Sequence, residues 1–202
     1  QISSRGQEQP KHGLSLSGDH IYKMNAGVVL ERHNESGADV TLATIQIDPD
    51  EVARFGVVEV DRDHRVLGFE EKPKVTKLRS PANPEKVCAS MGIYLFNTDV
   101  LIPVLLKDAE DPASSHDFGK DILPKMADDY RVYTYDFVDE NTKEALYWRD
   151  VGTLEAYYEA NMDIVAVSPV FNLHGSACPL LPPHRPHPPA KPRTPHTAPT
   201  PP

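Results

Sequence analysis

Apolar positions along the chain follow two periods, and the changes of period predict its elements. β-branched and aromatic residues recur at every second position, or form short apolar runs, in the stretches typical of strands. These strand patterns cover residues 13–16, 39–47, 56–73 (a hairpin that turns at 62–64), 88–97 and 131–138. The first run is followed by Ser-Gly-Asp, which predicts a buried strand ending in a tight turn, with Asp19 at its carboxyl end.

Helical patterns fill the intervals between these strands. Asn25 is a good N-cap for residues 26–36, and Gly37 supplies the C-terminal stop. Three further helices are predicted: one after a Thr98 cap, one over 114–129 and one over 153–166. Strands that alternate with helices in this way predict a three-layer α/β domain with a mixed sheet.

Composition narrows the range of partners. The 202 residues carry a formal charge of −9, which argues against nucleic acid or an anionic membrane as the main partner. Cys88 and Cys178 lie far apart, which fits a reducing, cytoplasmic setting and provides no disulfide framework. No apolar run approaches the ~20 residues of a membrane span, and the first residues lack the apolar core of a signal peptide.

The composition changes at residue 174. Residues 174–202 are dominated by proline and contain no acidic residue, so they predict a disordered or polyproline-like tail after a folded domain at 1–173. A PxxP ligand, a linker and out-of-frame sequence are the alternatives for this tail. The acidity of the chain therefore belongs to the domain.

Four short segments at predicted strand ends carry candidate chemistry: SGDHIYKM, FEEKP, SMGIYLF and YWRDVGT. Each has an ordinary structural explanation, such as a turn aspartate, a solvated charge cluster or a small residue that relieves crowding in a strand. Together they supply two separated carboxylates and a lysine to a sheet whose strand ends can converge. In open α/β sheets, ligands bind at such strand ends.

From about Glu8 to Leu173 the chain resembles the bacterial ADP-glucose pyrophosphorylases (glucose-1-phosphate adenylyltransferases). The motifs that carry the resemblance occur in the expected order: LSGDHIYKMN, GADVTLATI, FGVVEVD, GFEEKP, ASMGIYLFN, SSHDFGKDILP and YWRDVGTLEAYYEANMDI. The last two favour this family over related thymidylyl-, uridylyl- and guanylyltransferases. The resemblance implies a Rossmann-like three-layer sandwich of the nucleotide-diphospho-sugar transferase type, incomplete here, with a mixed, mainly parallel sheet.

The resemblance also implies a reaction and a set of site residues. The family joins glucose 1-phosphate to ATP, giving ADP-glucose and pyrophosphate for glycogen synthesis. Asp19 and Asp150 match its Mg²⁺ carboxylates, and Lys72 matches the lysine that holds the sugar phosphate. Glu71 matches the carboxylate that accepts hydrogen bonds from glucose hydroxyls. Gly56 and Ser90 match positions that line the sugar site, and Asp117 and Trp148 are expected either in the sugar pocket or in contact with the residues that line it.

Histidine is expected to have a supporting role. His20 is interpreted as steadying its loop, because the attacking phosphate is already anionic and needs no base. The nine histidines include no HxxxH or HExxH spacing, so a zinc site is not expected.

The resemblance covers only the middle part of the family's sequence. The family's GGxGTRL phosphate loop and its C-terminal β-helix, which carries much of the allosteric and oligomeric contact surface, have no counterpart here. We therefore expect a fragment of a parent enzyme that is an allosteric homotetramer when intact, with the isolated piece inactive. The alternatives are a regulatory-type module that binds a sugar phosphate without transferring it, and a nucleotidyltransferase of other base specificity. The joint presence of Asp19, Lys72 and Asp150 argues against a decayed regulatory subunit.

Overall fold

The computed structural model of the chain describes residues 10–138, 146–166, 169 and 171, and these form two compact units. The first unit contains residues 10–18, 25–138 and 146, and the second contains residues 19–24 and the described residues from 147 onward. The predicted tail at 174–202 lies outside the described residues. No helix of the described ranges is long and apolar enough to cross a membrane.

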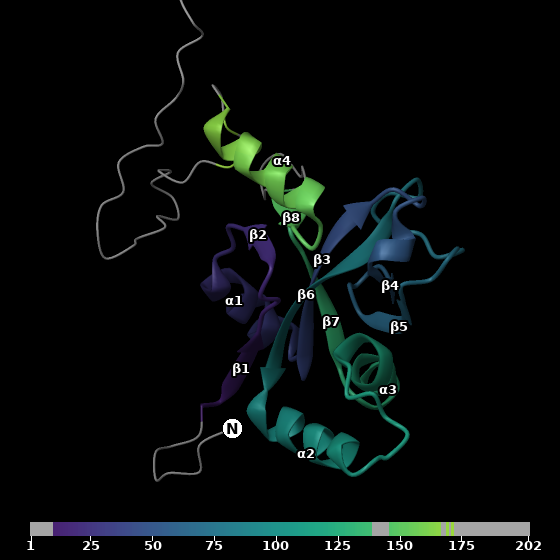
Figure 1. Ribbon diagram of the computed structural model, residues 1–202. Coiled ribbons are helices and arrows are strands. Elements are labelled where there is room, and N and C mark those ends of the chain that lie inside the picture. The colour runs from purple at the N-terminus through teal and green to yellow at the C-terminus, as the bar shows by residue number, and fades with distance from the viewer. Residues whose placement is uncertain (1–9, 139–145, 167–168, 170, 172–202) are drawn as a thin grey trace, which may run out of the picture. The chain divides into compact units, whose positions relative to one another are not determined.

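The first unit is built on a six-stranded sheet with helices on both faces (Figure 1). Its strands are β1 (His12–Ser15), β3 (Val40–Ile47), β4 (Gly56–Val60), β5 (Val66–Glu71), β6 (Val87–Asn97) and β7 (Val132–Asp136). Its helices are α1 (Ala26–Ser36), α2 (Thr98–Ala109) and α3 (Leu123–Asp129), with a 3-10 turn η1 (Val52–Arg54) and a π-helical turn η2 (Phe118–Ile122). The strand order is β5-β4-β6-β3-β7, and β1 pairs with β6 outside this path.

The sheet is mixed, as predicted, but parallel pairing does not predominate in it. β3 and β7 are parallel, whereas β1–β6, β3–β6, β4–β5 and β4–β6 are all antiparallel. The expectation of a mainly parallel sheet is therefore wrong for the described strands. The physical reason is that β4 and β5 form a hairpin, and that β6 runs opposite to each of its three neighbours.

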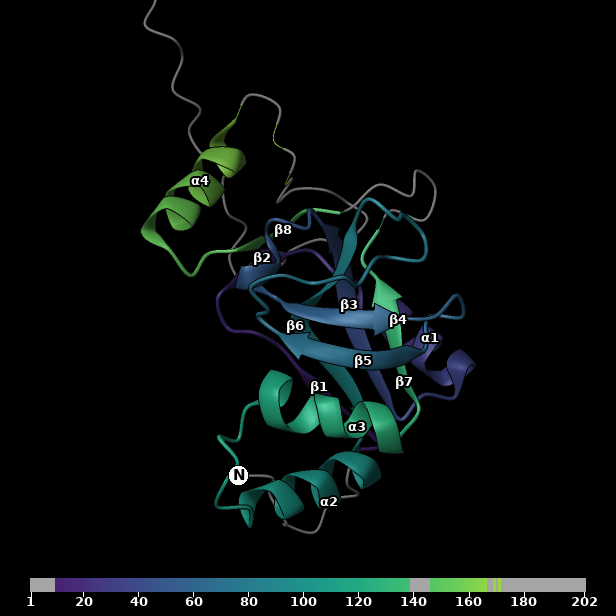
Figure 2. The same ribbon diagram turned by 90° about the vertical axis from the view of Figure 1, so that its right-hand side faces the viewer.

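Successive residues of β3 face opposite layers. Val40 and Leu42 belong to the apolar cluster that contains α3 residues, while Thr41 bonds His33 of α1. Because side chains alternate across a strand, α1 covers one face of the sheet and α3 the other. Figure 2 shows the two helices on these opposite sides. The three-layer α/β arrangement is confirmed.

A bend in β6 separates two pairing regions of this long strand. Gly92 has a φ of 68°, and the register of β3 against β6 shifts between Leu42 and Thr44. On its other side β6 pairs with β4 at Ala89 and then with β1 from Tyr94 to Asn97. Only glycine adopts such a backbone conformation without strain. The bend keeps the first half of β6 beside the β4–β5 hairpin.

Local sequence signals are confirmed at several elements. The Asn25 side chain accepts a hydrogen bond from the Gly27 amide at the start of α1, and Gly37 ends α1 at φ 61°. The hairpin turns where predicted: the Asp61 carboxylate accepts from the amides of Asp63 and Arg65. These elements are predictable from sequence because the hydrogen bonds that cap or turn them join residues only a few positions apart.

Three local predictions need correction. Residues before Asp19 form an edge strand, not a buried one: Leu14 and Leu16 are 42% and 53% exposed, and β1 ends before Asp19. The cap of α2 is Asn97, not Thr98, and it makes no side-chain cap bond because its amide oxygen meets His33. Helical structure within 114–129 begins only at Phe118.

The second unit contains a two-stranded antiparallel ribbon, β2 (His20–Tyr22) and β8 (Trp148–Asp150), followed by α4 (Leu154–Val165). Thr153 caps α4 by accepting a hydrogen bond from the Ala156 amide. Arg149 of β8 pairs with Glu159 at 2.6 Å and with Asp163 at 2.9 Å, which ties the strand to the helix. The predicted helix at 153–166 is confirmed.

Candidate active site

The end of the β4–β5 hairpin presents the Glu71 carboxylate between two glycines. Gly56 pairs with Glu71 across the hairpin, and a Cβ on Gly56 would lie 3.1 Å from Glu71 Oε2 and 2.9 Å from Phe69 Cε1. Gly119 of η2 lies on the same carboxylate: its added Cβ would stand 3.0 Å from Glu71 Cδ. Both positions therefore require glycine for close approach.

Lys72 follows Glu71 directly, and the backbone turns away from the direction of β5 at this residue. Its φ of 43° is in the left-handed region, which is uncommon for a residue with a side chain. Its Nζ lies 3.8 Å from Glu71 Oε1, and its side chain is 62% exposed. The turn thus leaves an accessible ammonium group beside the Glu71 carboxylate, and strained backbone of this kind is concentrated at ligand sites.

Asp117 holds the π-helical turn in place. Its Oδ1 accepts hydrogen bonds from the amides of Gly119 (2.8 Å) and Lys120 (3.0 Å). Burial raises the pKa of Glu71, the Lys72 charge opposes this, and the Asp117 charge raises it further. Asp117 is therefore close enough to Glu71 for the two carboxylates to repel each other.

Ser90 is linked to this group through Tyr94. The Ser90 hydroxyl lies 3.2 Å from the Tyr94 hydroxyl and accepts from the Gly92 amide at 3.2 Å. Burial raises the pKa of Tyr94, and the charges of Glu71 and Asp117 add to the rise. The Tyr94 ring also packs against Phe118 of the turn, with centroids 5.7 Å apart.

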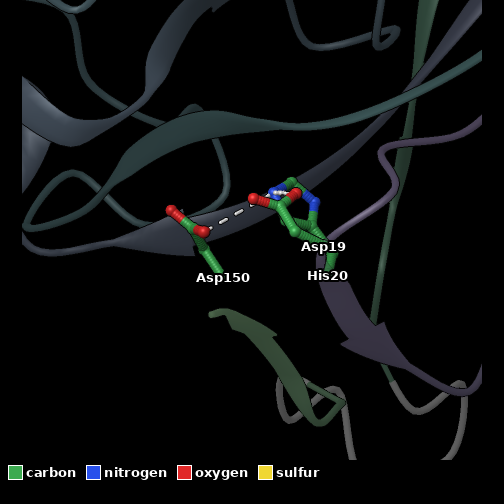
Figure 3. Close-up of side chains that lie close together, drawn as sticks. All are labelled: Asp19, His20 and Asp150. Atoms are coloured by element: carbon green, nitrogen blue, oxygen red, sulfur yellow. Dashed lines mark ion pairs between the residues drawn. The ribbon is translucent and has the colours of Figure 1, made fainter. Parts of the chain in front are cut away.

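A second group of polar side chains lies in the second unit (Figure 3). The register of β2 and β8 pairs His20 with Asp150, and Asp19 immediately precedes His20. His20 Nε2 is 3.6 Å from Asp19 Oδ1 and 3.9 Å from Asp150 Oδ1. The Gly152 amide donates to Asp150 Oδ1 at 2.9 Å, which fixes the orientation of that carboxylate.

This donor set fits a divalent cation. One ligand atom from each of Asp19, His20 and Asp150 lies within 4.8 Å of the others. Two carboxylates supply the oxygen donors that hard divalent cations prefer, and the 57% exposure of Asp19 leaves room for water and phosphate oxygens in the coordination shell. Asp19 and Asp150 are thus adjacent, as their predicted metal role requires.

Trp148 is the single tryptophan of the chain and belongs to this second group. Its ring meets the His20 imidazole edge to face, with centroids 5.1 Å apart and planes at 84°. The contact fixes the imidazole in front of the two carboxylates. A role for Trp148 in the sugar pocket stays a prediction.

The structure therefore collects the predicted residues into two groups. Gly56, Glu71, Lys72, Ser90 and Asp117 gather in the first unit, and Asp19, Asp150 and Trp148 gather in the second. Sequence reasoning missed Gly119, Gly152 and the role of Tyr94. Two of them had a local signal, since a glycine two residues after an aspartate favours a turn in which the aspartate side chain accepts the glycine amide.

Residues 3–167 match the family model described as "Nucleotidyl transferase". The chain belongs to this nucleotidyl transferase family. It is 66% identical over 179 residues to the glucose-1-phosphate adenylyltransferase of Koribacter versatilis, covering 89% of this chain and 43% of that protein. The enzymes of the same name from Shewanella oneidensis and Rhodopirellula baltica are both 47% identical; the matches cover 86% of this chain and 41% and 39% of those proteins. The chain thus spans less than half the length of the curated relatives it matches.

Proposed function

We propose that this chain is the sugar-phosphate and cation-binding part of a glucose-1-phosphate adenylyltransferase. The observation that carries the proposal is the Glu71–Lys72 pair, in which a carboxylate packed between two glycines adjoins an exposed ammonium group. A sugar phosphate offers hydroxyl donors and a phosphate dianion, which are the complements of these two groups. The names of the relatives support glucose 1-phosphate as the sugar and ATP as the nucleotide.

The reaction needs positioning more than it needs a reactive side chain. A phosphate oxygen of glucose 1-phosphate attacks the α-phosphorus of ATP in line. A new P–O bond forms, the bond between the α-phosphorus and its bridging oxygen breaks, and pyrophosphate leaves. The nucleophile is already anionic, so the protein contributes orientation and neutralisation of charge.

Residues of the first unit are assigned to the sugar phosphate. Lys72 holds the phosphate, because a compact cation on a flexible stem suits that group. Glu71 accepts hydrogen bonds from glucose hydroxyls. Ser90, Asp117 and Gly56 line the sugar site.

Residues of the second unit are assigned to the cation. Asp19 and Asp150 would hold Mg²⁺, and Trp148 would border the sugar pocket. The bound ion would neutralise charge on the phosphates. The Gly152 amide orients the Asp150 carboxylate, and His20 faces both carboxylates.

The proposal extends to the pathway, the location and the regulation of the parent enzyme. ADP-glucose is the activated glucose for glycogen synthesis, and the cytoplasm is the proposed location of the reaction. Allosteric control and a homotetramer are proposed for the parent enzyme only. A module that binds the sugar phosphate without transferring it is the competing function, and so is transfer from a nucleotide with another base.

Isothermal titration of glucose 1-phosphate into the purified chain tests the assignment. Lys72→Ala should abolish binding, whereas Lys125→Ala, a matched control on α3 paired with Asp111, should leave it unchanged. No binding by a folded chain, or equal binding by Lys72→Ala, would contradict the assignment of Lys72. A transfer assay with ATP, UTP, dTTP and GTP in the parent enzyme then separates the competing functions: ADP-glucose should be the main product.

A further inference from the structure

The imidazole of His20 faces both carboxylates of the second unit, and its role extends beyond steadying a loop. Its side chain is only 14% exposed, although the neighbouring Asp19 side chain is 57% exposed. The β2–β8 register sets His20 opposite Asp150, and Trp148 holds the ring from the side. The imidazole is therefore pre-positioned at the centre of the group.

The spacing of the three ligand atoms suits one ion. At metal–ligand distances of about 2.1 Å, ligands at right angles lie about 3.0 Å apart and opposite ligands about 4.2 Å apart. The observed separations from His20 Nε2, 3.6 Å to Asp19 and 3.9 Å to Asp150, lie between these values. Small side-chain movements would bring all three atoms around a single cation.

We propose that His20 Nε2 is a third protein ligand of the cation. Imidazole is the commonest metal ligand among side chains, and Mn²⁺, which accepts the same carboxylate and water oxygens as Mg²⁺, serves as the spectroscopic probe of the site. Two carboxylates alone would give an oxygen site. The inference rests on the proposed cation role of Asp19 and Asp150 and adds a nitrogen donor to it.

The alternative role for His20 is orientation of the carboxylates without contact to the ion. The two roles differ in a spectroscopic property. A ligated imidazole transfers spin density from Mn²⁺ to its nitrogen, so pulsed electron paramagnetic resonance detects a ¹⁴N coupling. An imidazole that only orients the carboxylates gives no directly bonded nitrogen.

The test is Mn²⁺ titration of the purified chain, followed by pulsed electron paramagnetic resonance of the bound ion. His20→Ala should remove the nitrogen coupling and weaken Mn²⁺ binding by about tenfold or more. His64→Ala is the matched control, because His64 pairs with Asp136 in the first unit and should change neither quantity. Far-UV circular dichroism and denaturant unfolding of the metal-free variant report whether it retains its fold.

The outcomes separate this inference from the proposed function. Mn²⁺ binding that is lost in Asp150→Asn but shows no nitrogen coupling would overturn the His20 inference and leave the carboxylate site in place. Absence of any Mn²⁺ binding by the folded chain would overturn both the inference and the cation assignment, while glucose 1-phosphate binding through Lys72 would stand on its own titration.

Discussion

Gly119 lies directly against the carboxylate of Glu71, so that a methyl group added at Gly119 would stand 3.0 Å from Glu71 Cδ. Gly119→Ala should therefore push the carboxylate away from its place while leaving the fold intact, because the displaced group is the end of a flexible side chain. We expect the dissociation constant for glucose 1-phosphate to rise about tenfold and the free energy of unfolding to change by less than about 1 kcal/mol.

Titration calorimetry and denaturant unfolding check the Gly119 prediction. Gly13→Ala is its control, since an added Cβ there meets Leu101 at an ordinary 3.6 Å. Unchanged sugar-phosphate affinity in Gly119→Ala would mean that the position of the Glu71 carboxylate does not limit binding.

Asp117 combines a capping role with a predicted sugar-site role, and two variants separate them. Asp117→Ala removes the acceptor of the Gly119 and Lys120 amides and should lower the free energy of unfolding by about 1 kcal/mol. Asp117→Asn keeps an acceptor oxygen, so stability should stay close to that of the parent chain. If Asp117→Asn nevertheless binds glucose 1-phosphate more weakly, the charge of Asp117 acts on the ligand. Equal affinities would confine Asp117 to the turn.

Asp19→Asn should affect turnover much more than stability. Asp19 is exposed, and the change removes one charge of the proposed cation site without opening a cavity. In the parent enzyme we expect kcat for ADP-glucose formation to fall about a hundredfold or more. Asp63→Asn in the exposed hairpin turn is the matched control. Near-normal turnover of Asp19→Asn at saturating Mg²⁺ would remove Asp19 from the cation site.

His33 should make the stability of the first unit depend on pH. It is buried against β3, with Nδ1 2.8 Å from Thr41 Oγ1 and Nε2 3.1 Å from Asn97 Oδ1; the His12 ring, Asp39 and Lys11 also act on it. Burial lowers its pKa below 6.5, while the Asn97 hydrogen bond opposes this. When folding lowers the pKa of a histidine, its contribution to the free energy of unfolding is fully present at pH values above the pKa of the unfolded chain. The contribution is lost as the pH falls below that pKa.

We therefore expect the free energy of unfolding to decrease from pH 6.5 downward, with a His33 contribution of up to about 1.4 kcal/mol per pH unit. His33→Gln should flatten this slope, whereas His64→Gln at the exposed hairpin turn should not. Denaturant unfolding at a series of pH values measures both. A slope that survives in His33→Gln must come from other groups.

Several features of the fold and the site were predictable because the residues that set them are neighbours in sequence. Asn25 and Gly37 delimit α1, and Asp61 turns the hairpin, through hydrogen bonds that span only a few residues. The Glu71–Lys72 pair could likewise be predicted, because the two residues are consecutive in sequence at the end of one strand. The family resemblance supplied the hypothesis that this pair binds a sugar phosphate.

The sequence by itself thus determined most strands and helices of the first unit, the caps of α1 and the identity of the polar residues. Tertiary structure alone decided that β6 runs antiparallel to its neighbours, that Gly119 abuts Glu71, and that His20 stands between Asp19 and Asp150. These relationships depend on strand register and on packing between segments remote in sequence, and a shift of one residue in the β2–β8 register would turn His20 to the opposite face. No periodicity within either segment encodes that register.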